Sequence, residues 1–249
     1  MLSTTPFWRD DFPRPDDLPV SDLPAEADVA VVGAGVTGLN AAREIVRSGM
    51  SVAVLDSGEV GAGASTVNGG MLNYGLKAPT VKVFNRYGST LGRQLWDASL
   101  AAIDHVESLV ATENIDCYFE RSGAAELGYR AQNLEEFREE AEWMQTTLDF
   151  DTQVIPNDEL AGVVDSDEFY CALVDGAGAG VHPARYVYGL ARSVGEAGAS
   201  LVENAEALNI AKHTTGYQIL TPKGKMTAGE VLMATNGYTG ARPVSALRR

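Results

Sequence analysis

The stretch VVGAGVTGLN, residues 31–40, constrains the fold of this chain more than any other part of its sequence. It holds three glycines in G-x-G-x-x-G spacing. The apolar run DVAVV comes directly before them and predicts a strand over 28–33, and a helical pattern follows over about 36–48. A second apolar run, SVAVLD, predicts a strand over 51–56. Both strands are nearly all apolar, as in parallel strands that are covered on two faces, so the chain begins with a predicted βαβ unit.

Each glycine of this turn has a physical reason to be glycine. Gly33 permits the tight turn after the strand, Gly35 lets the backbone approach a pyrophosphate, and Gly38 lets the helix pack closely on the sheet. Free N–H groups at the positive end of the helix would then bind the pyrophosphate. Asp56 stands 18 residues after Gly38, where a carboxylate can accept hydrogen bonds from ribose hydroxyls. The pattern therefore favours a dinucleotide site over a turn without a ligand.

The choice among dinucleotides depends on residues beyond this turn. Asp56 disfavours NADP, because a 2′-phosphate about 4 Å from its carboxylate would cost roughly 4 kcal/mol at an effective dielectric of 20. NAD and FAD bind to the same kind of turn. A nicotinamide dehydrogenase would continue with more βα units, whereas this chain continues with the loop GAGASTVNGG. Its small residues would let the backbone approach a flat ligand, with Ser65 and Asn68 as hydrogen-bond partners, but a flexible surface loop fits equally well.

The rest of the chain alternates between helical and strand patterns. The helical patterns cover about 89–113 and 132–148, and a third begins at Pro183. Residues 117–129 predict a hairpin that turns at Ser122-Gly123. The later strands are predicted at about 200–203, 207–212, 217–221 and 230–235. The predicted fold class is α/β, with a Rossmann-like βαβ core and part of an α+β substrate domain.

The composition excludes several classes of protein. Hydrophobic residues make up 45% and charged residues 21%, which is typical of a globular chain. A formal charge of -15 disfavours nucleic acid as a partner. No run approaches the roughly 20 apolar residues of a membrane helix, and the first residues do not resemble a signal peptide. Cys117 and Cys171 lack C-x-x-C spacing, which favours buried thiols in a reduced compartment. We therefore expect a cytoplasmic protein.

Other reactive residues have simpler explanations. His182, in VHPAR, is expected at the start of a helix, and His105 and His213 are expected to be solvated. DGAGAG at 175–180 is interpreted as a turn, because no strand-turn-helix context with Lys-Ser/Thr follows it. Tyr74 is a candidate for the active site, although a packing role is favoured. No His or carboxylate pattern has metal-ligand spacing, so no metal site is predicted, and no catalytic residue is assigned.

Four segments together resemble the FAD-dependent oxidoreductases of the D-amino-acid oxidase and glycine oxidase type, in particular the γ-glutamylputrescine oxidoreductase-like branch. They are FW near the start, DVAVVGAGVTGLNAAREIVRSGMSVAVLD, GAGASTVNGG, and the late pair GVHPARYVYGLARSVGEAGASLVEN and VLMATNGYTG. These segments follow the family's order over nearly the whole chain. The resemblance implies FAD as the cofactor.

The resemblance also carries over contacts residue by residue. The family's flavin loop maps onto Ser65, Asn68, Gly69 and Gly70, its adenine contact onto Ala207, and the segment that closes over the dinucleotide onto residues 234–237. Gly-Arg usually precedes the loop asparagine, and this chain has Thr-Val there, so that arginine has no counterpart. The first acidic residue is more often Glu than Asp. The predicted cofactor-binding residues are Gly33, Gly35, Gly38, Asp56, Ser65, Asn68, Gly69, Gly70, Ala207, Ala234, Thr235, Asn236 and Gly237.

The family's chemistry implies a reaction and a division of the chain. The resemblance implies oxidation of a small amine or amino acid: a hydride passes from the carbon next to nitrogen to flavin N5, and the imine hydrolyses. Family members continue well beyond the last strand seen here, so the chain is expected to be an N-terminal part that lacks a C-terminal half or a partner chain. The expected division is an arm at 1–27, an FAD-binding domain at 28–80 and 180–240, a partial substrate region at 81–179 and a truncated end at 241–249.

Two other functions stay open at this point. One is a catalytically silent dinucleotide-binding fragment that needs a partner chain. The other is an NAD-linked dehydrogenase. Flavin spectra with and without a partner would separate the first from an active oxidoreductase, and bleaching of bound flavin by substrate without nicotinamide would exclude the second.

Overall fold

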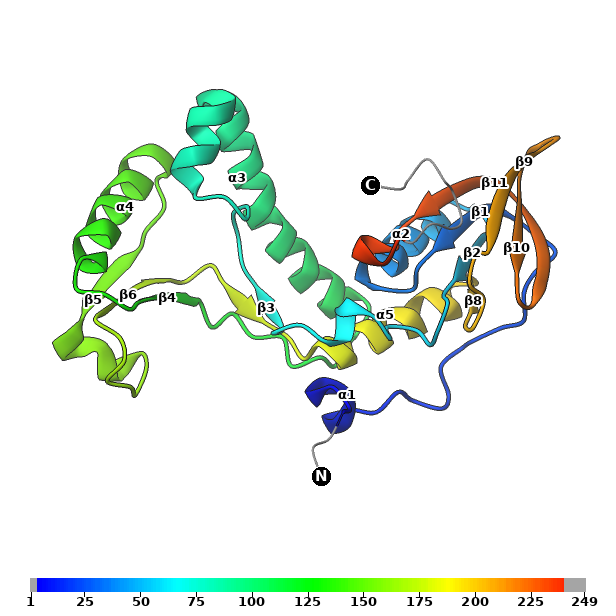
Figure 1. Ribbon diagram of the computed structural model, residues 1–249, viewed down its shortest axis with the longest axis horizontal. Helices are drawn as coiled ribbons and strands as arrows, with labels where there is room; N and C mark the ends of the chain where they lie inside the picture. The colour runs from blue at the N-terminus through cyan, green and yellow to red at the C-terminus, as the bar shows by residue number, and fades with distance from the viewer. Residues whose placement is uncertain (1–3, 240–249) are drawn as a thin grey trace. The chain divides into compact units, whose positions relative to one another are not determined.

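The computed structural model describes residues 4–239 (Figure 1). The predicted truncated end, 241–249, lies outside the described residues. The contacts divide the chain into two compact units. Among the described residues, unit 1 consists of 4–69, 110–117 and 182–239, and unit 2 consists of 70–109 and 118–181.

Unit 1 contains a six-stranded sheet with the strand order β8-β2-β1-β11-β10-β9. The four strands from β8 to β11 are parallel, and β10 is antiparallel to both of its neighbours. The elements of unit 1 are α1 (Phe7–Asp11), β1 (Glu26–Val32), α2 (Val36–Arg47), β2 (Val52–Leu55), the 3-10 helix η1 (Ala64–Thr66), α5 (Pro183–Glu196), β8 (Ser200–Val202), β9 (Asn209–His213), β10 (Gly216–Thr221), β11 (Gly224–Met233) and the 3-10 helix η3 (Asn236–Tyr238).

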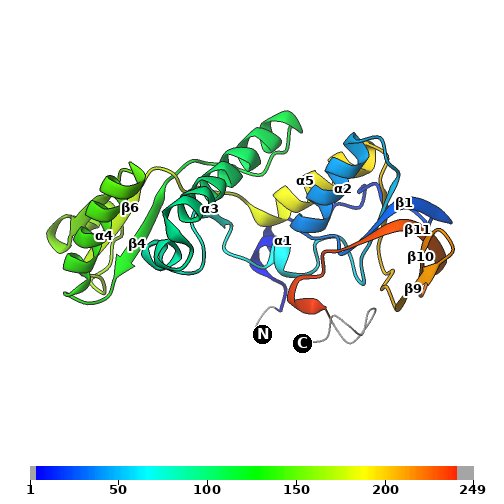
Figure 2. The ribbon, with the colours of Figure 1, turned by 90° about the horizontal axis from the view of Figure 1, so that it is seen from above.

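The predicted βαβ unit is present as β1, α2 and β2, with Val29 opposite Val52 and Ala30 opposite Ala53. All four residues of β2 are buried, because both faces of the parallel sheet are covered. Ile219 of β10 packs in the cluster on the face that includes Ala30 and Ala53. Helices α2 and α5 pack side by side (Figures 1 and 2). Gly49 follows the C-cap residue Ser48 of α2 and has φ 86°, a conformation in which glycine often ends a helix.

Unit 2 contains a three-stranded antiparallel sheet with the order β4-β6-β5 and a two-stranded sheet of β3 and β7. Phe137 of α4 packs against Cys171 and Leu173 of β6. Helix α3 is broken at Gly88, which has φ 78°. The elements are β3 (Met71–Leu72), α3 (Thr80–Thr112, whose last three residues belong to unit 1), β4 (Ala124–Gly128), α4 (Asn133–Leu148), β5 (Gln153–Pro156), the 3-10 helix η2 (Asn157–Gly162), β6 (Cys171–Asp175) and β7 (Ala179–Gly180).

Two sequence-based predictions were wrong. Residues 117–129 do not form a hairpin: β4 pairs with β6, and Glu120 pairs with Gly180. The turn residues were visible in the sequence, but the partner strand lies far along the chain. The last strand, predicted over 230–235, begins at Gly224, because its polar first half pairs with β10. Helix α5 does begin at Pro183, as predicted.

The described part of the chain has no helix that is both long enough and apolar enough to span a membrane. Cys117 and Cys171 are both buried, and they belong to different units.

Candidate dinucleotide-binding site

A cleft of about 640 Å³ opens in unit 1 at the carboxyl ends of β1, β2 and β11. Ligands of open parallel sheets bind at this edge of the sheet. Four segments that are distant in sequence form its wall: the glycine turn after β1, the loop after β2, Glu206 and Ala207 after β8, and the residues that follow β11. Eight of the predicted residues line it, namely Gly33, Gly35, Asp56, Ser65, Ala207, Ala234, Thr235 and Asn236.

The turn after β1 requires glycine for two separate reasons. Gly33 has φ 112°, and a Cβ there would lie 2.6 Å from the carbonyl oxygen of Ala234. At Gly38, a Cβ would overlap the carbonyl oxygen of Gly33 and lie 3.2 Å from a methyl carbon of Val31. Gly38 therefore lets α2 pack against β1 and against the turn itself. Both glycines are fixed by backbone contacts that leave no room for a side chain.

The start of α2, at Gly35 in the cleft wall, carries the partial positive charge of the helix dipole. Gly35 is the N-cap of α2 and has no side chain to accept from the helix N–H groups. The hydroxyl of Ser65 accepts from the Val36 N–H at 3.0 Å instead. A Cβ on Gly35 would lie 2.7 Å from that hydroxyl oxygen. Ser65 thus caps the helix from another segment, and its own O–H proton can donate to an anion in the cleft.

Asp56 links the turn to the loop. Its Oδ2 accepts from the Ala34 N–H at 2.7 Å, and its Oδ1 accepts from the Gly58 N–H at 2.9 Å. An ionised carboxylate has about four acceptor positions, so two remain for further donors. Asp56 can therefore hold the two backbone segments together and still accept hydrogen bonds from the hydroxyls of a ligand.

Five of the predicted residues, all described by the structure, do not line the cleft. The Asn68 carboxamide donates to the carbonyls of Ala64 and Ser65, at 3.1 and 2.9 Å, so it shapes the loop that carries Ser65. Gly38 acts by packing, as described above. The others are Gly69, Gly237 and Gly70, the last of which belongs to unit 2.

The residues that follow the late strands complete the wall. Ala207 is 4% exposed and comes five residues after the end of β8. The Ala234 N–H donates to the Val32 carbonyl at 2.8 Å, which joins the end of β11 to the end of β1. Asn236 has φ 49°, and this turn directs the chain along the cleft.

Sequence reasoning missed several side chains of the wall, among them Glu206 and Tyr238. The Tyr238 ring is 69% exposed, and its Cε2 lies 3.4 Å from the position of a Cβ on Gly63. The tyrosine in ATNGY was the available signal. With Asp56 and Glu206, the wall has two carboxylates, and its described residues include no Lys, Arg or His. Phosphate groups would therefore be bound by N–H and O–H groups rather than by cationic side chains.

Tyr74 has a packing position in unit 2. Its ring lies 5.0 Å from those of Trp96 and Phe150, and its hydroxyl donates to Asp175 Oδ2 at 2.8 Å. Burial, and secondly the Asp175 carboxylate, raise the pKa of Tyr74 well above its usual value. The phenol therefore stays protonated near neutral pH, which agrees with the favoured interpretation of Tyr74 as a packing aromatic.

The three histidines also lie as expected. His182 is the N-cap of α5, and its Nδ1 accepts from the Arg185 N–H at 3.3 Å. His105 on α3 and His213 at the end of β9 are exposed. Residues 4–239 contain no cluster of His, Cys, Asp and Glu suited to a metal ion.

The sequence profile of the family described as "FAD dependent oxidoreductase" (DAO) matches residues 28–248. This chain belongs to that family of FAD-dependent oxidoreductases. The resemblance inferred from the four segments is therefore confirmed.

Individual relatives agree with this assignment. The chain is 31% identical over 242 residues to "Probable oxidoreductase OrdL" of Rhizobium meliloti (strain 1021), which covers 96% of this chain and 56% of the relative. It is 29% identical over 213 residues to "Gamma-glutamylputrescine oxidoreductase" of Escherichia coli (strain K12), and the match covers 86% of this chain and 50% of that relative. The chain spans about half the length of these curated relatives.

The fold is that of solved members of the class. The glycine oxidase of Geobacillus kaustophilus superposes with a TM-score of 0.70 at 23% identity, over 88% of this chain and 57% of the other. This likeness confirms the mixed α/β fold with a Rossmann-like FAD-binding core.

Proposed function

We propose that this chain contributes the FAD-binding part of an oxidoreductase that oxidises a small amine or amino acid. One observation carries the proposal: a glycine turn without side chains, the start of a helix and the Asp56 carboxylate meet in one cleft at the carboxyl ends of parallel strands. Family membership favours FAD over the nicotinamide of an NAD-linked dehydrogenase. Because the chain spans about half of its relatives, the activity is proposed for the protein or assembly that includes the remaining half.

The cleft fits the adenosine diphosphate end of FAD. Its volume of about 640 Å³ is in the range of small-molecule sites, which is roughly 300–1,000 Å³. The glycines at 33 and 35 expose backbone to the cleft, and the hydroxyl of Ser65 lies beside the start of α2. A pyrophosphate needs such donors, and a ribose needs an acceptor of the kind that Asp56 provides.

Each residue has a proposed role in holding the cofactor. The Gly35 backbone, the start of α2 and the Ser65 hydroxyl bind the pyrophosphate, Asp56 accepts from the ribose, and Ala207 contacts the adenine. Residues 234–237 close over the dinucleotide. Asn68, Gly69 and Gly70 complete the predicted set as residues that shape or extend the flavin loop.

A flavin bound here supplies the two-electron oxidation of a C–N bond, giving an imine that water hydrolyses. The described residues bind and orient it. The names of two relatives support the proposed substrate class: one is a γ-glutamylputrescine oxidoreductase and the other a glycine oxidase. The acidic composition disfavours a nucleic-acid partner, and two cysteines without C-x-x-C spacing support a reduced, cytoplasmic compartment.

The domain assignment is likewise a proposal: an FAD-binding domain at 28–80 and 180–240, preceded by the arm at 1–27, with 81–179 as part of a substrate region. We expect the 249-residue chain to bind FAD weakly, because half of its relatives' length is absent from it. Recovery of a yellow, stoichiometric flavoprotein that turns over an amine would contradict this expectation.

Titration of the chain with ADP and FAD, followed by backbone NMR, tests the site directly. We expect shifts at the amides of residues 33–37 and 57–65. Asp56→Asn should weaken binding about tenfold, since it removes a charged acceptor. Asp116→Asn is the matched control, because Asp116 is an exposed carboxylate of unit 1 outside the cleft wall. If Asp56→Asn binds ADP and FAD as tightly as the unmodified chain, or if the amide shifts fall outside these residues, the assignment of this cleft is wrong.

A further inference from the structure

The part of the arm that the structure describes before β1, residues 4–25, contacts the loop that lines the cleft. We call residues 57–69 the cleft loop. The Trp8 Nε1–H donates to the Asn68 carbonyl at 2.7 Å, and Arg9 pairs with Glu59 at 2.7 Å. Both contacts fall on the cleft loop, one near each end. The arm therefore reaches the segment that carries Ser65.

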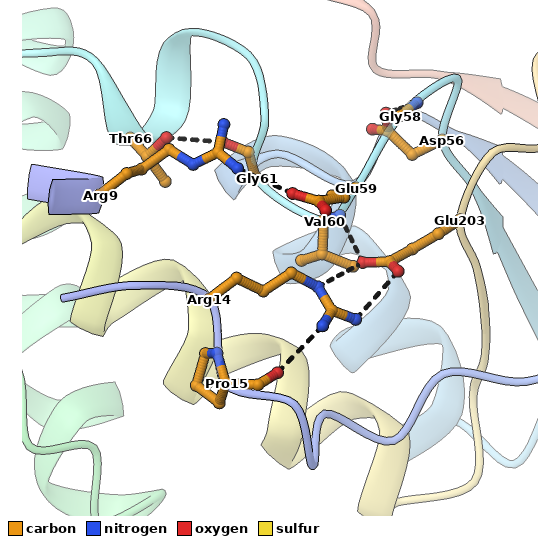
Figure 3. Close-up of polar contacts among 10 residues, drawn as sticks. All are labelled: Arg9, Arg14, Pro15, Asp56, Gly58, Glu59, Val60, Gly61, Thr66 and Glu203. Atoms are coloured by element: carbon orange, nitrogen blue, oxygen red, sulfur yellow. Dashed lines mark hydrogen bonds and ion pairs between the residues drawn. The ribbon is translucent and has the colours of Figure 1, made fainter. Parts of the chain in front are cut away.

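A third contact is stronger and better shielded. The Arg14 guanidinium binds the Glu203 carboxylate through Nε and Nη2, with both distances 2.9 Å (Figure 3). The two side chains are 17% and 12% exposed. Paired, charge-assisted hydrogen bonds of this kind are about twice as strong as neutral ones. A third nitrogen of Arg14, Nη1, donates to the Pro15 carbonyl at 3.0 Å, which fixes the guanidinium in the arm.

Glu203 transmits this contact to the cleft loop. Its Oε1 also accepts from the Val60 N–H at 2.8 Å. The next residue, Asn204, donates its N–H to the Gly58 carbonyl at 2.9 Å. The short segment after β8 thus fixes residues 58–60 of the loop, and Arg14 fixes the carboxylate that does so.

Only a few bonds separate this network from the cleft wall. Two residues before Val60 in the sequence, the Gly58 N–H donates to Asp56 (Figure 3). Directly after Val60, the Gly61 N–H donates to the Ala34 carbonyl at 3.1 Å, and the Gly61 carbonyl accepts from the Thr66 hydroxyl at 2.7 Å. A displacement of Val60 would therefore move the loop on both sides, including the backbone on which Ser65 stands.

We propose that Arg14 and Glu203 are positioning residues that hold the cleft loop in the conformation that binds the pyrophosphate of FAD. The inference rests on the proposed function. Neither residue lines the cleft, so both act through the Val60 backbone. Preorganisation of a binding loop raises affinity by lowering the entropy lost on binding.

The arm has other attachments, which make a matched control available. Arg192 of α5 pairs with Asp17 at 2.7 Å, and the Ser21 N–H donates to the Leu201 carbonyl at 2.8 Å. Neither contact touches the cleft loop. Arg14→Ala therefore leaves the arm attached at these points, whereas Arg192→Ala removes an ion pair of the arm and spares the Glu203 network.

The experiment compares Arg14→Ala, Arg14→Lys, Glu203→Gln and Arg192→Ala in the full chain. Hydrogen exchange at the Val60 and Gly61 amides reports the loop, ADP titration by NMR reports the site, and urea unfolding reports stability. We expect Arg14→Ala to speed exchange at Val60 and to weaken ADP binding, each about tenfold. Arg14→Lys keeps the charge and Glu203→Gln keeps an acceptor, so both should show smaller effects. Arg192→Ala should change neither the exchange at Val60 nor the affinity for ADP.

The outcomes separate this inference from the proposed function. If the unmodified chain binds ADP and Arg14→Ala binds it equally well, the positioning role is wrong and the site stands. If Arg14→Ala and Arg192→Ala lose affinity in proportion to lost stability, the arm is merely structural and the inference also fails. If the unmodified chain binds neither ADP nor FAD, the proposed function fails, and the inference fails with it.

Discussion

The two units use their polar groups in opposite ways. In unit 1, backbone N–H groups, the Ser65 hydroxyl and the Asp56 carboxylate line an open cleft. In unit 2, the Tyr74 hydroxyl donates a hydrogen bond to Asp175, and the Tyr74 ring belongs to an aromatic cluster with Trp96. Glycine turns keep backbone accessible in the first case, and large side chains fill space in the second. The difference supports the proposal that the dinucleotide binds in unit 1, whereas the described aromatic core of unit 2 serves in packing.

The largest expected loss of stability comes from a substitution in the aromatic core of unit 2. Trp96 is 3% exposed and packs against Tyr74, Phe150 and Met144. Trp96→Ala should lower the free energy of unfolding by about 3–5 kcal/mol. Urea unfolding measures the loss. The ADP-induced amide shifts in unit 1 should persist under native conditions, and their disappearance would contradict the division of roles between the units.

A smaller effect is expected from the glycines of unit 1. Gly38→Ala places a methyl group on the Gly33 carbonyl and should cost about 3 kcal/mol, since the backbone must move. Gly49→Ala is the matched control: its φ of 86° is strained, but nothing lies within 4 Å. We expect about 1 kcal/mol there. Equal losses in urea unfolding would show that the turn tolerates a side chain at Gly38.

The smallest effect concerns pH. Ser193 donates to Glu113 at 2.6 Å, and the Arg43 Nε–H donates to it at 2.8 Å. The Ser193 hydrogen bond, and then Arg43, lower the pKa of Glu113. This carboxylate therefore adds stability above its unfolded pKa of about 4.3, and the contribution is lost as the pH falls through the lower folded value.

Glu113→Gln should remove that pH-dependent contribution. Solvent screening keeps the contribution of Glu113 to the free energy of unfolding under about 1 kcal/mol. Unfolding curves at pH 7 and at about pH 3.5, in the two proteins, give the difference directly. A variant that loses as much stability on acidification as the unmodified chain would show that another group titrates.

Much of the local structure could be predicted from the sequence. The βαβ unit, helix α4 and the start of α5 at Pro183 all follow from periodicity and from residues with restricted backbone angles. Pairing between distant strands could not be predicted. The strand at 124–128 was assigned to a local hairpin, because a turn signal reveals a change of direction and does not identify the partner.

The site divides along the same line. The sequence indicated Gly33, Gly35 and Asp56, because a turn between strand and helix restricts which residues can occupy it. It gave no sign that Ser65 caps α2, and none of the contact between Arg14 and Glu203, which are 189 positions apart. Such contacts depend on where the whole backbone brings two segments together.

By itself, then, the sequence determined the type of each main element, the glycine turn and the class of ligand it suits, because these depend on neighbouring residues and on backbone sterics. Only the tertiary structure decided which strands pair, which side chains reach the cleft and what holds its loop in place. Those choices depend on burial of apolar surface and on hydrogen bonds between residues far apart in the chain, and no short pattern encodes them.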